Sequence, residues 1–285
     1  MGYDDRTKSE NQARNAMRPH RVNFFAACLL TTLHWLPCTS LAHDFWIDPD
    51  RFGLQAGDSV ALTLRQGVRM KGDSLPYLTP LIADFSVTDG TGRNVIQSVM
   101  GNDPAAMLVV RSGTTLVGYQ SNRDYVVIEP QKFRQYLDDE GLDNIADERR
   151  TRGEQNDPAR EYFIRCSKLL LQAAPASSNE IFRTRLDYTL ELMPETDPSE
   201  LSAGNELSLQ LLYLEQPISG VLVRAISKEH PDEPAESRTD AEGRATLILP
   251  RSGTWLIKAV HMIRLESDSK ADWESYWASL LFHLQ

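Results

Sequence analysis

The sequence predicts a mainly β protein, with two antiparallel, sandwich-like β-domains joined by a short helical segment after an N-terminal signal peptide. Three observations predict this organisation. The chain opens with a basic, then apolar, then small-residue order that is typical of secretory signals. Short runs with apolar side chains at every second position recur with glycine-containing turns between them, which is typical of strands. Apolar residues at helical spacing are confined to the middle of the chain.

The signal peptide is predicted over residues 1–42. A short basic region precedes an apolar run over residues 22–36, and Ser40-Leu41-Ala42 supplies small residues three and one before a cut. The apolar run is interrupted by polar residues and is shorter than the roughly 20 residues that span a bilayer. We therefore expect cleavage after Ala42 and export to the periplasm, with His43 as the first residue of a mature chain that has no transmembrane helix.

Two alternatives remain open at this end of the chain. Residues 1–16 are polar, so Met17 is an alternative start of translation. A lipoprotein cut before Cys38 is less favoured, because Trp35-Leu36-Pro37 matches poorly the small residues that precede such a cut.

The composition of the mature chain limits its partners. Cleavage leaves 243 residues, enough for one large domain or two small ones. It removes five basic and three acidic residues, so the net charge moves from −10 to −12. An acidic chain argues against nucleic acid as a partner, because phosphate binding needs clustered Lys and Arg. Only Cys166 remains, which excludes an intramolecular disulfide although exported chains usually meet an oxidising compartment.

The first β-domain is predicted over residues 43–130. Phe45-Trp46-Ile47 is costly to leave in water, so we expect it to pack as a first strand or against a domain seam. From Ser59, the side chains of Val60, Leu62 and Leu64 alternate with less apolar ones. Further strands are predicted over Asp84–Thr88, Asn94–Val99, Met107–Val110, Thr114–Gly118 and Tyr125–Glu129.

A helical and loop segment is predicted over residues 131–185. Phe133, Tyr136 and Leu137 fall at helical spacing before a stop at Gly141. Asp157-Pro158 is typical of a helix start, and apolar residues from Tyr162 to Leu170 follow at spacings of three and four. We therefore expect a second helix ending before Pro175, and a mobile loop over the charged residues 143–157.

The C-terminal domain is predicted over residues 186–285 as an immunoglobulin-like or transthyretin-like β-domain. A linker containing Pro198 separates its first strand from the others. The predicted strands are Leu186–Leu192, Leu207–Leu211, Gly220–Ile226, Arg244–Leu249, Trp255–Met262 and Tyr276–Leu284. We expect Trp273, Tyr276 and Trp277 to serve core packing rather than to form a binding platform.

The sequence lacks the short motifs that usually identify an enzyme. There is no G-x-S-x-G elbow, no P-loop, no H-E-x-x-H and no C-x-x-C pair. We therefore expect a protein without catalytic residues.

The strongest candidate for chemistry is His43. After cleavage behind Ala42, this residue carries both a free α-amine and an imidazole, and the two nitrogens can close a chelate ring on one metal ion. Nitrogen pairs suit copper, nickel, cobalt and zinc, with affinity following the Irving–Williams order. The alternative is that a histidine stands at the new terminus by chance.

Three further residues are candidate metal ligands. Asp44 offers an oxygen next to the terminus, or serves only as solvating charge. His261 falls on an apolar strand face, where a lone histidine is more often a hydrogen-bonded core residue than a ligand. Met262 points to the opposite face of a regular strand, so His261 and Met262 share a metal only at a strand end or bulge.

The mature start His43-Asp44-Phe45-Trp46-Ile47-Asp48-Pro49 resembles the opening of a family of bacterial periplasmic proteins with a domain of unknown function. Members are often described as the periplasmic component of a cobalt or nickel ABC transport system. Further matching stretches are Phe133–Leu137, Glu140–Leu142, Arg160–Arg165 with Lys168, Leu190–Leu192, Asp197-Pro198, Thr239-Asp240, Gly243-Arg244 and Asp272–Leu280. The resemblance implies that His43 pairs with His261 and Met262, and that the chain serves an inner-membrane metal transporter or an outer-membrane receptor.

The last β-region also resembles transthyretin-like and carboxypeptidase-regulatory domains. The stretches that carry this likeness are Gln216–Val221, Thr239–Gly243 and Gly253–Trp255. Such domains are usually binding or structural modules without catalysis.

These observations lead to one functional hypothesis and two alternatives. The hypothesis is a periplasmic protein that binds a divalent transition metal (nickel, cobalt or copper) and is associated with metal uptake. The first alternative is a non-catalytic structural or interaction module of the envelope, with no role for metal. The second is a copper-dependent oxidative enzyme that uses the N-terminal His43 and needs a second histidine beside it.

Overall fold

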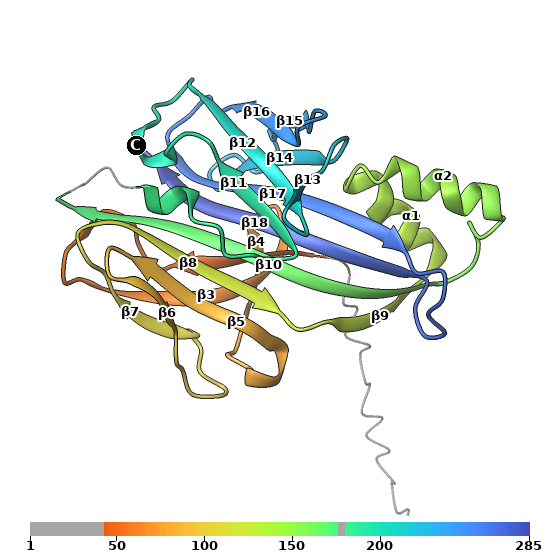
Figure 1. The fold of residues 1–285 in the computed structure, drawn as a ribbon, viewed down its shortest axis with the longest axis horizontal. Helices are drawn as coiled ribbons and strands as arrows, with labels where there is room; N and C mark the ends of the chain where they lie inside the picture. The colour runs from red at the N-terminus through yellow and green to blue at the C-terminus, as the bar shows by residue number, and fades with distance from the viewer. Residues whose placement is uncertain (1–42, 176–179) are drawn as a thin grey trace, which may run out of the picture. The chain divides into compact units, whose positions relative to one another are not determined.

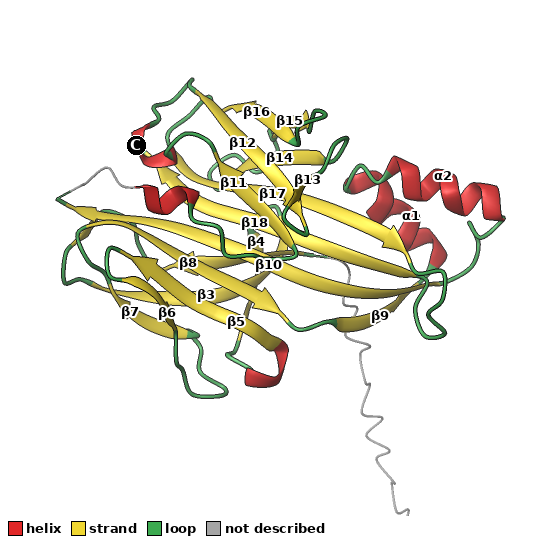
Figure 2. Ribbon diagram, viewed as in Figure 1, coloured by secondary structure: helices red, strands yellow, loops and turns green. Residues whose placement is uncertain are grey.

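The computed structural model of the chain describes residues 43–175 and 180–285. The predicted signal peptide therefore lies outside the described residues, together with Met17 and Cys38. The described residues belong to one compact unit. This unit is mainly β, with three sheets and two α-helices in its described part (Figures 1 and 2). The predicted fold class, a mainly β protein with sandwich-like packing of sheets, is confirmed.

A ten-stranded sheet forms the centre of the unit. Its longest strands are β10, β17 and β18, and β18 lies between the other two. It pairs with β10 in parallel and with β17 antiparallel. The strand order is β15 (Ala235–Arg238), β14 (Leu222–Ser227), β17 (Gly253–Arg264), β18 (Trp273–Leu284), β10 (Ala159–Ala174), β8 (Gly113–Ser121), β5 (Ile82–Asp89) and β6 (Gly92–Val95), with β2 (Leu54–Gln55) and β9 (Asp124–Ile128) also paired to β10.

Two four-stranded sheets cover the central sheet. In Figure 1 the sheet that contains β11 and β12 is drawn above the central sheet, and the sheet that contains β3 and β7 is drawn below it. The first comprises β11 (Leu190–Pro194), β12 (Glu206–Tyr213), β13 (Gln216–Pro217) and β16 (Arg244–Ile248); the second comprises β1 (Asp44–Pro49), β3 (Ser59–Val68), β4 (Lys71–Leu75) and β7 (Ala106–Val109).

The helices lie together between β9 and β10 in the sequence. They are α1 (Pro130–Asp139) and α2 (Asp143–Arg152), drawn in red in Figure 2 with three short 3₁₀ turns, η1 (Thr79–Leu81), η2 (Glu180–Arg183) and η3 (Pro198–Glu200). Pro130 stands at the first helical position, where its missing N–H is not needed. Gly141 has a φ of 65°, a left-handed conformation that glycine adopts readily, so the chain turns there between the two helices.

Alternation along the central strands places buried apolar side chains on both faces of the sheet, in three clusters. On β17, Trp255, Ile257 and Ala259 face the sheet of β11 and β12. Leu256 faces the sheet of β1 and β3. Met262, an even-numbered position like Leu256, packs on the same face against α1 and α2. Because successive side chains of a strand point to opposite faces, β17 contributes to clusters on both sides of the sheet.

The two predicted β-domains meet within the central sheet. Strands β5, β6, β8 and β9 come from residues 43–130, and strands β14, β15, β17 and β18 come from residues 186–285. The strand that joins the two sets is β10, which lies in the segment predicted to be helical and loop.

The helix predicted after Asp157-Pro158 is wrong, because this segment forms β10. Its apolar residues satisfy helical spacing, but they also fit a strand that is covered on both sides. Leu169, Leu170 and Leu171 are consecutive and all buried, with Leu170 facing one core and its two neighbours facing the other. A continuous apolar run of this kind does not distinguish a helix from a doubly covered strand.

The loop predicted over residues 143–157 is also wrong for its first ten residues, which form α2. This helix has few apolar side chains, and it is held mainly through Ile145 and Arg149, both of which are buried. The Arg149 guanidinium donates to the carbonyls of Glu154 and Asp157 and lies 4.9 Å from the centre of the Phe133 ring. These contacts are tertiary, so the local sequence does not reveal them.

Candidate functional site

Strand β1 fixes the residues that follow the predicted cleavage point. All six of its residues are buried, and it pairs antiparallel with β3 from Asp44↔Gly67 to Pro49↔Leu62. Trp46 and Ile47 pack in the core beneath the central sheet. The expectation that these apolar residues form a first strand is confirmed, and His43 lies at the anchored start of that strand.

The His43 ring is held by a relay of two polar contacts. Gln66 Nε2 lies 3.3 Å from His43 Nδ1, and Arg165 Nη2 donates to Gln66 Oε1 at 2.8 Å. A guanidinium only donates hydrogen bonds, so Oε1 faces Arg165 and the Gln66 amino group faces His43. The Arg165 guanidinium is itself placed between the rings of Phe45 and Phe163, at 5.5 and 4.9 Å from their centres. Gln66 therefore donates to Nδ1, which leaves the ring proton on Nε2.

The protonation of His43 follows from its surroundings. Burial lowers the pKa of the imidazole from 6.5; the charge of Asp44 opposes this shift and the charge of Arg165 adds to it. At neutral pH the ring is therefore uncharged. Its Nδ1 presents a lone pair, which is the form of histidine that coordinates a metal ion.

A buried ion cluster lies next to His43. The Lys258 ammonium contacts Asp44 and lies 2.7 Å from Glu140 Oε1, with all three side chains at most 10% exposed. Burial by itself would lower the pKa of Lys258, but the two carboxylates together raise it. Burial raises the pKa of Glu140 against the opposing charge of Lys258. The cluster joins β1, the end of α1 and β17.

A cavity of about 360 Å³ opens beside His43 and this cluster. It is bordered by β1, α1, β14 and the loop that carries Pro231 and Pro234. Four basic residues (Arg69, Lys132, Arg224 and Lys258) and four acidic residues (Asp44, Asp139, Glu140 and Glu236) line it. The charges therefore balance, and the cavity does not attract cations by net charge alone.

Another buried carboxyl group, that of Glu161, lies behind the cavity wall. Glu161 accepts hydrogen bonds from the Tyr136 hydroxyl at 3.2 Å and from the Ser275 hydroxyl, while its Oε2 has no partner among the described residues. Burial raises the pKa of Glu161 to about 7, although both hydrogen bonds oppose the shift. Tyr136 lines the cavity and separates it from this carboxyl group.

The structure places His261 away from His43. His261 packs on Tyr213 of β12 and Tyr276 of β18, with ring centres 4.6 and 6.3 Å apart, so it faces the sheet of β11 and β12. Lys258, three positions earlier on the same strand, faces β1. His43 and His261 therefore lie on opposite sides of the central sheet. Burial lowers the pKa of His261 to about 4.

Met262 and Asp44 are also occupied by contacts of other kinds. Met262 is buried among aromatic side chains that include Phe133 and Trp277, and β17 pairs regularly with β18 throughout this region, so Met262 and His261 face opposite sides. Asp44 is bound by Lys258. Within residues 43–175 and 180–285, no group of three or more His, Cys, Asp or Glu side chains is arranged to hold a metal ion.

The sequence analysis missed Lys258, Glu140, Gln66 and Arg165. One signal was present for Lys258, since it stands at an inward position of a strand whose neighbours on that face, Leu256 and Val260, are apolar. A charged residue at such a position indicates a buried ion pair. Glu140, Gln66 and Arg165 meet their partners through the packing of segments that are distant in the sequence, which the local pattern does not show.

Other sequence-based expectations concern the core and the membrane. Trp273, Tyr276 and Trp277 are buried, as expected for core packing. Burial raises the pKa of the Cys166 thiol to about 12. Among the described helices, none combines the length and the apolar character needed to cross a bilayer.

Comparisons with known proteins identify the family. The model of a family described as a domain of unknown function (DUF4198) matches residues 40–263, and the chain belongs to this family. The search of curated proteins found no match. Among solved structures, a tetra-tandem repeat from the extending region of a large adhesion protein is 12% identical, with a TM-score of 0.21 over 86% of this chain and 50% of that one. The D0-D1 domain of intimin is 11% identical, with a TM-score of 0.19 over 84% of this chain and 97% of that one.

This chain thus spans half the length of the adhesion-protein segment. At these TM-scores neither structure bears on the fold or the function of this chain.

Proposed function

We propose that this chain is a periplasmic protein, cleaved after Ala42, that binds a divalent transition metal (nickel, cobalt or copper) as cargo for an uptake system. The observation that carries the proposal is the relay from Arg165 through Gln66 to His43. It orients a neutral imidazole with its Nδ1 lone pair free of a proton, at the residue that cleavage makes the N-terminus.

The proposed ligands are the α-amine and Nδ1 of His43. These two nitrogens close a six-membered ring with one metal ion, and the metal replaces the weak 3.3 Å hydrogen bond from Gln66. Burial of β1 fixes the backbone of the next residue, which lowers the conformational entropy lost on binding. Water or a partner protein completes the coordination shell.

The balanced charges of the cavity support nitrogen chelation rather than simple attraction of cations. Asp44 and Glu140 both already contact Lys258, and Glu140 also lies 4.0 Å from Arg224, so they provide no free carboxylate pair for a hard ion such as calcium. A nitrogen chelate selects instead along the Irving–Williams order. We therefore expect copper to bind more tightly than nickel, and nickel more tightly than cobalt.

Calorimetry on the protein that begins at His43 tests the proposal. We expect Ni(II), Co(II) and Cu(II) to bind with one site each. Replacing His43 with alanine, or retaining Ala42 in front of it, should weaken binding by more than the roughly 10–100-fold that loss of an outer-shell partner costs. The matched controls are His230→Ala and His261→Ala, which leave the terminus intact and should bind metal like the parent protein.

Two results would contradict the proposal. One is that no metal binds more tightly than about millimolar, which corresponds to about 4 kcal/mol. The other is that the protein that retains Ala42 binds as well as the one that begins at His43.

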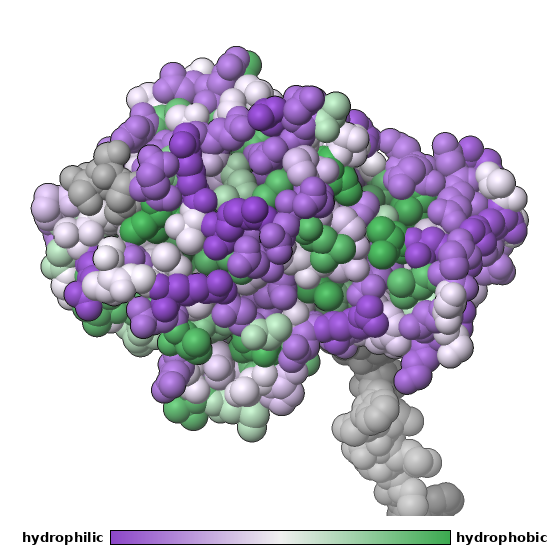
Figure 3. All heavy atoms as spheres, in the orientation of Figure 1, coloured by the Kyte–Doolittle hydropathy of each residue, from purple (hydrophilic) through white to green (hydrophobic). Residues whose placement is uncertain are grey.

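An envelope interaction module is the second candidate, and one surface feature favours it. Five of the eleven large apolar residues exposed in the described part of the chain fall within residues 95–109, on β6, β7 and the loop between them. Figure 3 shows apolar side chains at the lower edge of the molecule, where this loop lies. An unchanged growth requirement for metal in cells that carry His43→Ala, together with loss of function from charged residues at Met107 and Val109, would favour this alternative.

A further inference from the structure

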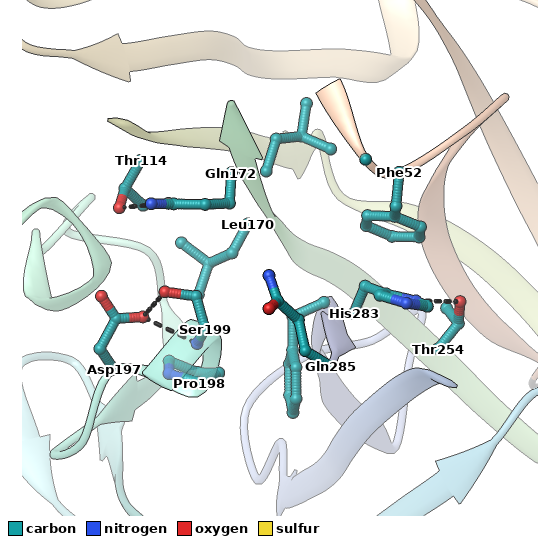
Figure 4. A pocket seen from close by; sticks show the side chains of 13 residues that line it. Phe52, Thr114, Leu170, Gln172, Asp197, Pro198, Ser199, Thr254, His283 and Gln285 are labelled. Carbon is teal, nitrogen blue, oxygen red and sulfur yellow. Dashed lines mark hydrogen bonds between the residues drawn. The ribbon is translucent and has the colours of Figure 1, made fainter. Parts of the chain in front are cut away.

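A second cavity, of about 510 Å³, lies at the end of the central sheet where β18 finishes and β17 begins. It shares no lining residue with the cavity beside His43. Its volume falls within the roughly 300–1,000 Å³ that is typical of sites for small organic molecules. Figure 4 shows its side chains converging from β8, β10, β17, β18, the η3 turn and the loop after β1.

The walls of this cavity are largely apolar. Phe52, Leu170, Pro198 and Phe282 line it. The Phe52 ring stacks on His283, with the ring centres 5.0 Å apart and the planes at 24° (Figure 4). Aromatic and aliphatic walls of this kind favour a ligand with an apolar body, because the contact removes apolar surface from water.

Asp197 is the one Asp or Glu side chain among the described residues that line the cavity. Asp197 is 7% exposed, and its Oδ1 accepts hydrogen bonds from the backbone N–H and the hydroxyl of Ser199, at 2.9 and 2.8 Å. Its Oδ2 has no partner among the described residues, and no Lys or Arg lines the cavity. In the described part of the chain, Asp197 forms no ion pair, so its charge is available to a cationic ligand in the cavity.

Gln172 and His283 also present polar atoms to the cavity. Thr114 donates to Gln172 Oε1 at 2.8 Å, so the Gln172 amino group remains free. The His283 Nδ1 lies 3.3 Å from the Thr254 hydroxyl, and its Nε2 is free among the described residues. These groups orient a polar ligand, whereas Asp197 decides its charge.

We propose that this cavity binds a small organic amine. The protonated amino group lies against the free oxygen of Asp197, and the aromatic or aliphatic body lies against Phe52, Phe282 and Leu170. A neutral analogue forgoes the charge-assisted hydrogen bond, which corresponds to roughly a tenfold loss of affinity. An anionic analogue binds still more weakly, because its carboxylate meets that of Asp197.

Three probes that share one ring test the charge preference. Calorimetry on the purified protein would compare 2-phenylethylamine, 2-phenylethanol and 3-phenylpropionate. We expect the amine to bind at least about tenfold more tightly than the alcohol, and the acid to bind most weakly. Failure of the amine to bind at millimolar concentration, or equal binding of all three probes, would overturn the proposal. Neither result bears on metal binding at His43.

Single substitutions test whether the preference for the amine arises at Asp197. Asp197→Asn keeps the side-chain shape and the hydrogen bonds from Ser199, so it should remove the preference for the amine over the alcohol. Asp240→Asn is the matched control, because Asp240 accepts the backbone N–H of Glu242, two residues on, in the same way but lies outside the cavity. Persistence of the amine preference in Asp197→Asn would also overturn the proposal.

Phe52→Ala keeps the test decisive if Asp197→Asn does not fold. It removes an apolar wall and leaves the charge, so it should weaken the amine and the alcohol by a similar factor. Unchanged affinity for both probes in Phe52→Ala would show that they bind elsewhere, and the proposed site would be rejected.

Discussion

Replacing Lys258 with methionine tests how the start of β1 is held in the fold. Methionine has nearly the length of the lysine side chain but no charge, so the change leaves the space filled. It removes the only ammonium group that contacts both Asp44 and Glu140 in the described residues. Two buried carboxylates then face each other without the cation between them.

The expected loss of stability follows from the burial of the three side chains, at most 10% exposed each. Removing one partner of a buried ion cluster costs about 3–5 kcal/mol, because the remaining charge is left uncompensated. For a chain of this size, about 1 kcal/mol shifts the melting temperature by roughly 2–4 °C. We therefore expect Lys258→Met to lower the melting temperature by roughly 6–20 °C at pH 7.5.

The difference in melting temperature between Lys258→Met and the parent protein should become smaller as the pH falls. Burial raises the pKa of Glu140, and removing Lys258 raises it further. A carboxyl group whose pKa is higher in the folded state stabilises the fold below its unfolded pKa, and this contribution is lost as the pH rises through the folded pKa. The melting temperatures of the variant and the parent protein should therefore lie closer together at pH 5 than at pH 7.5.

Thermal unfolding followed by circular dichroism measures both effects. The control is a triple variant, Lys258→Met with Asp44→Asn and Glu140→Gln, which removes every charge of the cluster and should recover most of the lost stability. A Lys258→Met variant that melts within about 2 °C of the parent protein at pH 7.5, a shift of no more than about 1 kcal/mol, would refute this account of the cluster.

Two further substitutions test the buried groups of the central sheet. Because burial raises the pKa of Glu161 to about 7, the stability of the wild-type protein should fall as the pH rises from about 4.5 to 7. Glu161→Gln should remove this dependence. Above pH 8, urea unfolding should show the variant to be roughly 2–4 kcal/mol more stable than wild type. A Cβ atom on Gly118 would lie 2.3 Å from the Leu186 side chain, so Gly118→Ala should destabilise the fold by about 1–3 kcal/mol, whereas Gly90→Ala, with nothing within 4 Å, should be nearly neutral in the same assay.

Most strands could be predicted from the sequence because their two faces have different surroundings. Apolar and less apolar side chains therefore alternate along them, and this alternation identifies a strand. The alternation of Val60, Leu62 and Leu64 matches their burial in β3. The prediction failed for β10, whose second half is covered on both faces and therefore lacks the alternation that identifies a strand. It failed for α2 because Arg149 holds this helix through contacts that local composition does not show.

The candidate site was only partly predictable for a related reason. His43 could be singled out because the cleavage motif and the histidine are adjacent in the sequence. Its surroundings could not, since Lys258 lies 214 residues from Asp44 and Arg165 lies 99 residues from Gln66. The pairing of His43 with His261 failed because strand alternation sends Lys258 and His261 to opposite faces of β17.

Under the proposed function, cleavage creates the metal site without changing the fold. The contacts that hold the start of the mature chain come from β1 itself, through its pairing with β3 and the burial of Trp46 and Ile47. None of these contacts needs residue 42, so the protein keeps the same core before and after cleavage. Only the nitrogen of His43 changes, from a protonated peptide nitrogen, which is a poor ligand, to an amine that chelates readily. Metal binding should therefore begin with cleavage, which in this proposal takes place during export and restricts the cargo to the periplasm.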